Sequence, residues 1–162
     1  MRKAFSLIEL LIVITLAGVT AILAFNYLNM ESISKNNIKL ELQSHFNIIT
    51  ATILQCKEYS NIMPIQSGGS EASDTLLSTL ECNTTTPYQL DGGKGAFIPP
   101  PLNDFTAYTA TQNASEFYFS TRTSINSYSD EVLQELQTNY STNQYELTSD
   151  ATTTTLKFYL SR

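Results

Sequence analysis

The first part of the chain is almost uniformly apolar. Between Phe5 and Phe25 only a few side chains are not strongly apolar, namely Ser6, Glu9, Thr15, Gly18 and Thr20. As an α-helix this run would be about 32 Å long, enough to cross the roughly 30 Å hydrocarbon layer of a membrane. The pattern therefore predicts a transmembrane helix over residues 5–28.

A second helical pattern follows without a break. No Pro or Gly occurs from Glu31 to Glu58, and apolar residues recur every three or four positions, at Ile38, Leu42, Phe46, Ile49, Ile53 and Cys56. We predict that residues 29–60 continue the helix as an amphipathic segment whose apolar stripe faces the chain's own core. A weaker apolar line lies opposite, at Ile33, Leu40, Ala51 and Leu54. We interpret this line as a contact with adjacent copies, the alternative being scattered surface hydrophobic residues.

The remaining residues, 61–162, are predicted to form a globular β domain that begins with a connecting loop. Turn signals are frequent up to Gly95, with an apolar patch at Leu76, Leu77 and Leu80 that suits a short helix. Strands are predicted at 96–98, 116–121 and 156–160, with weaker candidates at 105–109 and 144–147. Pro99 to Pro101 should end the first strand. A short helix is predicted near 130–140, with Ser129 as its N-cap.

These elements together predict an α+β fold. A long N-terminal helix, with a transmembrane half and an amphipathic half, is expected to pack on a small antiparallel sheet.

Glu9 is the exception within the apolar run. An ionised side chain in hydrocarbon costs roughly 3 kcal/mol or more, so such residues usually have a partner. A secretory signal peptide would use Arg2 and Lys3 as its basic region and Val19-Thr20-Ala21 as its cleavage site, yet it has no use for an acid. A simple signal anchor fits the length and the charge bias and also leaves Glu9 unexplained.

The sequence MRKA followed by FSLIELLIVITLAGVTAILAF resembles the prepilin amino terminus of type IV pilins and type II secretion pseudopilins. In this family a peptidase removes a short basic leader just before a Phe, the new amino terminus is methylated, and an acid is the fifth residue of the mature chain. The resemblance implies a leader at residues 1–4, cleavage between Ala4 and Phe5, N-methylation of Phe5, and a role for Glu9 in assembly.

The resemblance also suggests why an acid is present. Cleavage would place a cationic amine on Phe5, and in a filament the amine of an incoming subunit could meet Glu9 of a subunit already assembled. An unpaired buried acid would disfavour any subunit docked at the wrong height. The alternative is an acid at the level of the lipid headgroups that does little.

Further expectations about fold, partners and location follow from the resemblance. It implies a pilin-like fold, and it implies other pilin or pseudopilin subunits, the prepilin peptidase and an inner-membrane assembly platform as partners. It places the chain in the bacterial inner membrane as a single-pass protein, with its C-terminal domain in the periplasm and at the cell surface after assembly.

The sequence departs from the family pattern at three points. Ala4 stands where the family usually has Gly, and since Ala is the next smallest side chain we expect cleavage to be slower or equally competent and not lost. The other two departures favour a minor pilin or pseudopilin over a major pilin. Asn26 stands where major pilins tend to have Pro. The common type IV pilins have a C-terminal disulfide loop, whereas this chain has no Cys after Cys82.

Cys56 and Cys82 are the two cysteines of the chain. A disulfide is permitted if this part of the chain lies outside the cytoplasm. A bridge would join the end of the long helix to the following loop, and a buried free thiol at Cys56 is the alternative. We predict the bridge.

Charge and motifs argue against nucleic-acid binding and catalysis. The net charge is −6, and without Arg2 and Lys3 the chain has 7 basic residues against 15 acidic ones. Direct nucleic-acid binding needs a clustered basic surface and is therefore not expected. No nucleophile, phosphate-binding or zinc motif occurs, so we expect no enzyme, no cofactor and no metal. His45 is expected to be a solvated surface residue, and Asp91 and Asp104 do not form an ordered calcium-ligand pattern.

The sequence thus predicts a structural subunit of a type IV pilus-like or type II secretion filament, assembled from the inner membrane after cleavage and N-methylation. The alternatives are a tip adhesin or DNA-capturing minor pilin, which an exposed basic or aromatic patch would favour, and a major pilin.

Overall fold

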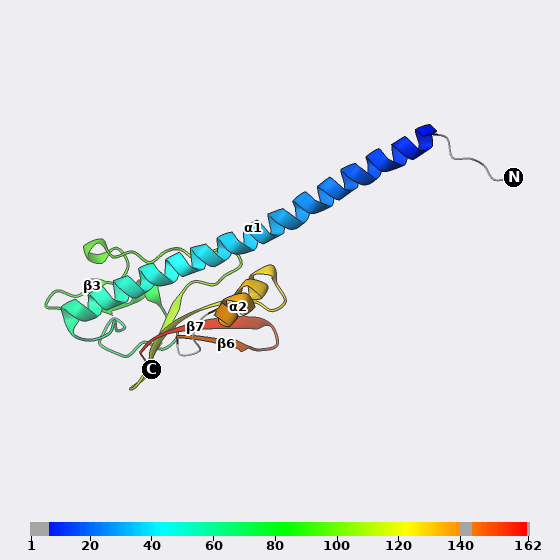
Figure 1. Cartoon of the computed structure of the whole chain (residues 1–162). Coiled ribbons are helices and arrows are strands. Elements are labelled where there is room, and N and C mark those ends of the chain that lie inside the picture. Colours follow the sequence, from blue (N-terminus) through cyan, green and yellow to red (C-terminus); the bar gives the residue numbers. More distant parts are fainter. Residues whose placement is uncertain (1–6, 140–143, 162) are drawn as a thin grey trace. The chain divides into compact units, whose positions relative to one another are not determined.

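The computed structural model describes residues 7–139 and 144–161, with the side chains of residues 12–21, 34–138 and 144–160. The chain divides into two compact units, Met1–Asn37 and Ile38–Arg162. Along the chain, a long helix precedes a region of short strands, and a second α-helix follows the fifth strand and precedes the sixth (Figure 1).

Helix α1 runs from Leu7 to Ser60 and passes from the first unit into the second. It contains a single Gly, at position 18, and no Pro, so its sequence has little that would break the hydrogen-bonding pattern. The helix ends where Asn61 takes the left-handed conformation, with φ of 60°, and donates its N–H to the Lys57 carbonyl at 2.7 Å. Asn tolerates this conformation better than most residues, which explains the position of the end.

The main sheet has five antiparallel strands in the order β1-β4-β5-β7-β6. Its strands are β1 (Thr75–Leu76), β4 (Thr109–Gln112), β5 (Phe117–Ser124), β6 (Tyr145–Ser149) and β7 (Thr153–Ser161). A separate two-stranded sheet pairs β2 (Glu81–Cys82) with β3 (Tyr88–Gln89). The other helices are α2 (Tyr128–Asn139) and the 3₁₀ turns Leu77–Thr79 and Gly93–Gly95.

An aromatic cluster joins the C-terminal part of α1 to the sheet. The register places Phe119 of β5 and Tyr145 of β6 on either side of Phe158 of β7. The ring of Phe46, on α1, lies 5.6 Å from the Phe119 ring and 5.7 Å from the Phe158 ring. Packed aromatic pairs at such distances contribute about 0.5–1.5 kcal/mol each beyond the apolar area that they bury.

The predicted core stripe of α1 is confirmed. Leu42, Ile49 and Ile53 are fully buried, and Phe46 and Cys56 are nearly so. Helix α2 adds Val132, Leu133 and Leu136 to the same core. An ion pair of 3.0 Å between Lys39 of α1 and Glu135 joins the two helices. Both helices therefore contribute to one core with the inner face of the sheet.

The predicted second helix is present, although its N-cap is not Ser129. The helix begins at Tyr128, and the Ser127 hydroxyl accepts the N–H of Asp130 at 3.1 Å. The Asp130 carboxylate in turn accepts the N–H of Asn126 at 3.0 Å. Ser127 can therefore cap the free N–H groups of the first turn, whereas Ser129 is already inside the helix and buried.

The strand predictions are partly correct. Strands β5, β6 and β7 cover the expected regions, but residues 96–98 form no strand and residues 105–108 precede β4. At 96–98 the chain is held by side-chain contacts instead: Thr52 of α1 donates its hydroxyl to the Phe97 carbonyl at 3.3 Å. The prolines that follow offer no N–H to a neighbouring strand, which disfavours sheet pairing there.

The α+β class and the antiparallel sheet are observed, but the expected pilin-like fold class is wrong in its main feature. That prediction had a long N-terminal helix, half of it transmembrane, packed on the sheet. Only from Ile38 onward does α1 belong to the unit that contains the sheet. A helix packs on a sheet through an apolar stripe with polar neighbours, and that stripe starts at Ile38.

Within residues 7–139 and 144–161, no helix combines the length and the apolar character needed to cross a membrane. This finding contradicts two predictions: that half of the helix is transmembrane, and that the chain is a single-pass protein of the inner membrane. The transmembrane prediction was based on the apolar run from Phe5 to Phe25, of which Phe5 and Ser6 lie outside the described residues.

Two leucines of α1 provide a test of this packing. Leu42 is fully buried and Leu40 is 63% exposed. We expect Leu42→Ala to lower the free energy of unfolding by about 2–5 kcal/mol because it leaves a cavity in the core. Leu40→Ala should change it by no more than about 0.5 kcal/mol. Urea unfolding followed by circular dichroism measures both, and equal losses for the two variants would contradict the assignment of the buried face.

Candidate functional site

The residues predicted to be processed and to assemble the filament lie at the edge of the described structure. Ala4 and Phe5 are outside the described residues. Glu9 lies within α1, but the structure does not describe its side chain. Cleavage between Ala4 and Phe5, N-methylation of Phe5 and the pairing of Glu9 therefore stay predictions.

The predicted disulfide between Cys56 and Cys82 is present. Their Cα atoms are 5.5 Å apart across a sequence separation of 26 residues, and both side chains are buried. The bond joins the last turns of α1 to strand β2. Next to it, Glu81 and Ile65 exchange backbone hydrogen bonds of 2.8 and 3.0 Å. The connecting loop is thus attached to the helix by a covalent bond and by backbone pairing.

The described side chains at the start of α1 form an apolar and exposed segment. Every residue from 12 to 21 is exposed. The exposed fractions of the large apolar side chains are between 50% and 62%, at Ile12, Val13, Ile14, Leu16 and Val19. A helix that is apolar on all sides is stable in water only when other apolar groups surround it. This segment therefore has the character of an interaction surface.

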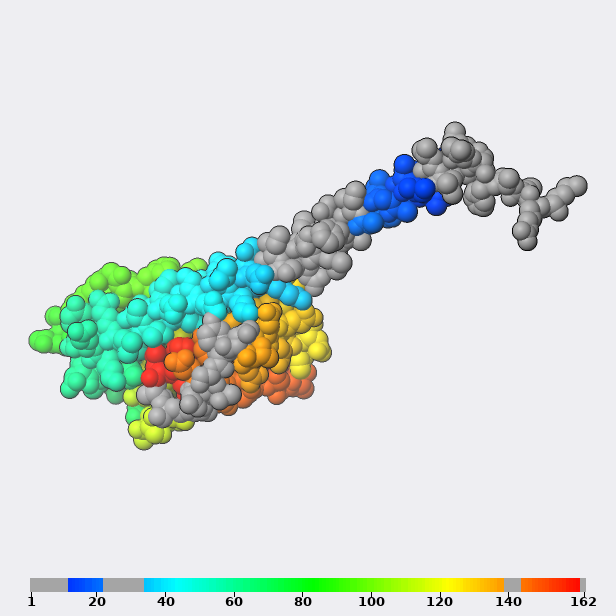
Figure 2. Space-filling view, in the orientation of Figure 1, coloured from blue at the N-terminus to red at the C-terminus, as the bar shows by residue number. Residues whose placement is uncertain are grey.

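A second exposed line lies on α1 within Ile38–Arg162, opposite the buried stripe. We call it the outward face: Leu40, Asn47, Ala51 and Leu54. Leu40 is 63% exposed and Leu54 is 47% exposed. In the space-filling view the later residues of α1, coloured cyan, form part of the molecular surface (Figure 2). The prediction that this line lies outside the core is confirmed for Leu40, Ala51 and Leu54, whereas the side chain of Ile33 is outside the described residues. The contact of the line with other copies stays a prediction.

The sequence predicts that His45 is a solvated surface residue, and this prediction is wrong. Its side chain is half-buried, and its Nδ1 lies 2.8 Å from the hydroxyl oxygen of Tyr108. Burial lowers the pKa of His45, although the nearby Glu41 carboxylate opposes this effect. Burial and Glu41 also raise the pKa of Tyr108, so its hydroxyl keeps its proton. A neutral imidazole can then accept that proton in a hydrogen bond at Nδ1. The two residues are 63 positions apart, and no local sequence signal links them.

Asp91 and Asp104 have structural roles in loops. The Asp91 carboxylate accepts the backbone N–H of Ile98 at 3.1 Å. Asp104 has a positive φ of 68°, a conformation that Asp tolerates in turns. Among the described residues, no three His, Cys, Asp or Glu side chains are grouped so that they could hold a metal ion.

One exposed aromatic group includes a cation. The Lys94 ammonium lies 5.3 Å from the ring centre of Tyr59 and 4.9 Å from that of Tyr88. Tyr59 is 59% exposed. Nucleic-acid binding requires several basic groups on one surface, and a cluster built around one ammonium does not supply them. The cluster therefore does not supply the basic surface that the DNA-capturing alternative requires, and the tip-adhesin alternative stays a prediction.

Comparison with known proteins gave no match: no family model, no curated protein and no solved structure is significantly similar to this chain. The functional argument therefore depends on the residues of the chain itself.

Removing the disulfide should destabilise the fold. In the chain-entropy model, closing a loop of this length contributes about 3.5 kcal/mol. We expect Cys56→Ala/Cys82→Ala to lower the free energy of unfolding by about this amount in urea titrations. The parent protein, treated with an alkylating agent without reductant, should have no labelled Cys. A double variant as stable as the parent would show that the bond contributes nothing.

Stability should depend on the protonation of His45. Because the folded-state pKa lies below the ordinary value of about 6.5, the unfolded state binds more protons as the pH falls through and below that value. The free energy of unfolding should therefore be unaffected by His45 above pH 6.5 and should decrease below it.

The measurement compares parent and His45→Gln by urea unfolding at about pH 7.5 and pH 5. The parent should lose more stability than His45→Gln between the two values, because carboxylates titrate in both proteins and cancel in the comparison. Tyr108→Phe, which removes the partner hydroxyl and keeps the ring, serves as the matched control for the lost hydrogen bond. An identical pH dependence in parent and His45→Gln would contradict the prediction.

Proposed function

We propose that the chain is a structural subunit, a minor pilin or pseudopilin, of a type IV pilus-like or type II secretion filament. The prepilin-like sequence around Ala4, Phe5 and Glu9 supports this proposal. The observation on which it mainly depends is the exposed apolar helix surface at residues 12–21.

This surface suits association with identical or related helices. Fully burying one Val, Leu or Ile side chain yields about 1.5–3 kcal/mol. Five such side chains are at least half exposed in the segment: Ile12, Val13, Ile14, Leu16 and Val19. In a helical bundle, the corresponding segments of neighbouring subunits would cover them. The apolar area of this segment favours a bundle of several helices over a single contact, because the exposed residues occupy all sides of the helix.

Glu9 would provide the register in such a bundle. After cleavage, the amine of Phe5 on one subunit would pair with Glu9 of another. The Coulombic attraction is small in water and larger inside an apolar bundle. A wrong register would leave the carboxylate buried and unpaired, which is strongly unfavourable. In this proposal, Glu9 determines the register of each subunit relative to its neighbours, while the apolar side chains contribute most of the association energy.

The outward face supports a second contact between subunits. Leu40 and Leu54 are separated by 14 positions, or about four helical turns, and would lie about 21 Å apart along the helix. Ala51, next to Leu54 on this face, is small enough for another helix to approach closely. Asn47 lies between them and could hydrogen-bond at a fixed position. The partners in this proposal are other pilin or pseudopilin subunits, a prepilin peptidase and the assembly platform of such a machine.

The test measures incorporation into filaments in the native host. Intact mass should first show that the chain in the filament begins at Phe5. The amount of chain in sheared filaments, relative to the amount in cells, should then fall at least about tenfold for Glu9→Ala, which corresponds to about 1.4 kcal/mol. Glu41→Ala is the matched control because Glu41 is an exposed acid on the same helix, and it should assemble like the parent.

A second pair tests the apolar surface itself. Leu16→Gln should reduce incorporation, and Leu76→Gln should not, although both leucines are exposed, by 61% and 44%. Unchanged incorporation of both Glu9→Ala and Leu16→Gln would refute the proposal. A chain that starts at Met1 or after Ala21 in the filament would exclude the prepilin processing on which it depends.

A further inference from the structure

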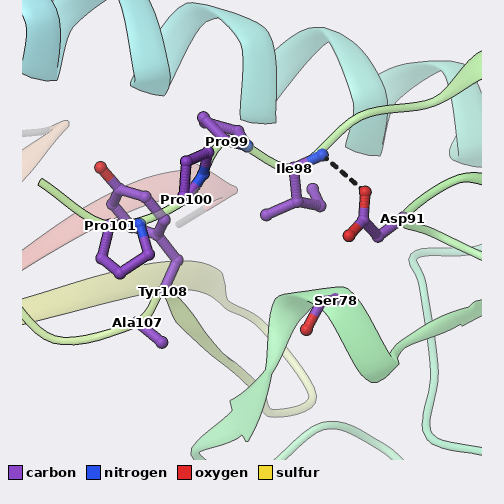
Figure 3. Close-up of a pocket in the computed structure, with 8 residues that line it drawn as sticks. All are labelled: Ser78, Asp91, Ile98, Pro99, Pro100, Pro101, Ala107 and Tyr108. Atoms are coloured by element: carbon purple, nitrogen blue, oxygen red, sulfur yellow. Dashed lines mark hydrogen bonds between the residues drawn. The ribbon is translucent and has the colours of Figure 1, made fainter.

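A cavity of about 260 Å³ lies between the loop that contains Pro99 to Pro101 and the start of the sheet. It is lined by Ser78, Asp91, Ile98, Pro99, Pro100, Pro101, Ala107 and Tyr108 (Figure 3). All these residues belong to the unit Ile38–Arg162. Pro100, Pro101 and Ala107 are exposed, so the cavity opens to solvent on their side.

One end of the cavity is polar. Asp91 and Ser78 lie on the same side of the open space, across from the three prolines (Figure 3). The Ile98 N–H donates to one oxygen of the Asp91 carboxylate at 3.1 Å and so fixes its orientation. Among the described residues of the lining, Asp91 is the single charged group at neutral pH. The polar end therefore has negative charge and a hydroxyl that can accept a hydrogen bond.

The other end is apolar and rigid. Three consecutive prolines have fixed φ angles and form one wall. Tyr108 is held by the hydrogen bond between its hydroxyl and His45 on α1, so the hydroxyl is already engaged and the ring lines the cavity. Ile98, 8% exposed, adds an aliphatic surface. Such preformed walls lower the entropy cost of binding.

Size and charge together limit the ligand. Cavities that hold drug-sized molecules or cofactors usually have about 300–1,000 Å³. This cavity, at about 260 Å³, is below that range and therefore suits a small ligand. A carboxylate at the partly buried polar end and an apolar wall opposite it complement a cation on a short carbon chain. Anions and large planar ligands do not fit these features.

We propose that this cavity binds a primary alkylammonium group, with the ammonium at Asp91 and Ser78 and the carbon chain against the prolines and the Tyr108 ring. Two kinds of ligand carry such a group: a free small amine, and a lysine side chain presented by another protein. The proposal does not depend on the filament function.

The experiment titrates the full-length, ¹⁵N-labelled chain with n-butylammonium chloride at constant ionic strength and follows backbone amide shifts. We expect saturable shifts at the amides of Asp91, Ile98 and Ala107, with a Kd of about 1–10 mM. n-Butanol, which has the same carbon chain without the charge, should bind at least about tenfold more weakly, because a charge-assisted hydrogen bond is lost.

Asp91→Asn and Asp104→Asn form the matched pair of variants. Both remove one negative charge from a loop, and the amide oxygen introduced by Asp91→Asn can still accept the Ile98 N–H. Asp91→Asn should weaken n-butylammonium binding at least about tenfold, whereas Asp104→Asn should leave it within about twofold. Ala107→Leu, which fills the mouth without changing charge, should also weaken binding.

A capped lysine, N-acetyl-lysine N-methylamide, distinguishes the two sources. If a protein presents the ammonium, the capped lysine should bind at least as tightly as n-butylammonium, since its backbone would remain outside the mouth. If the natural ligand is a free amine, the capped lysine should bind at least about tenfold more weakly. The absence of saturable shifts, equal binding of n-butanol, or unchanged binding by Asp91→Asn would each overturn the proposal.

Discussion

The packing of Phe46 and its neighbouring apolar residues of α1 on the inner face of the sheet is the interaction on which the rest of the structure depends. Phe46 approaches the rings of Phe119, Tyr145 and Phe158, which come from three different strands. These strands are far from α1 in the sequence, so their contact with one helix side chain couples the whole sheet to α1. Removal of the stripe would leave the apolar face of the sheet in water, at a cost of about 1.5–3 kcal/mol for each large side chain.

The two sides of α1 have different energetic roles within Ile38–Arg162. The side with Leu42 and Phe46 is fully used by the fold, whereas Leu40 and Leu54 on the outward face contribute little to it. A substitution on one side of α1 can therefore change the stability of the fold without changing assembly, and a substitution on the other side can do the reverse. This separation makes the proposed assembly function accessible to experiment, because a variant of an exposed leucine should remain folded.

The irregular region between α1 and β4 is ordered by specific bonds rather than by regular secondary structure. The Cys56–Cys82 disulfide attaches it to the helix, and the contact of the Asp91 carboxylate with Ile98 shapes the loop before the prolines. The hydrogen bond between His45 and Tyr108 connects the end of this region to α1. The last two of these contacts also hold Asp91, Ile98 and Tyr108, which line the proposed ammonium site.

The sequence by itself determined the features that depend on local periodicity. The stripe from Ile38 to Cys56, helix α2 and strands β5 and β7 could be predicted, because the spacing of apolar residues directly reflects which side of an element is buried. The disulfide could be predicted as well, since the chain has only two cysteines. Only the tertiary structure decided the features that depend on residues distant in the sequence. The loop at 96–98 forms no strand because Thr52 and the following prolines hold it otherwise, and His45 is half-buried because Tyr108, 63 positions away, packs against it. Hydrogen bonds and burial of this kind are properties of the folded arrangement, and a local pattern of apolar and polar residues contains no record of them.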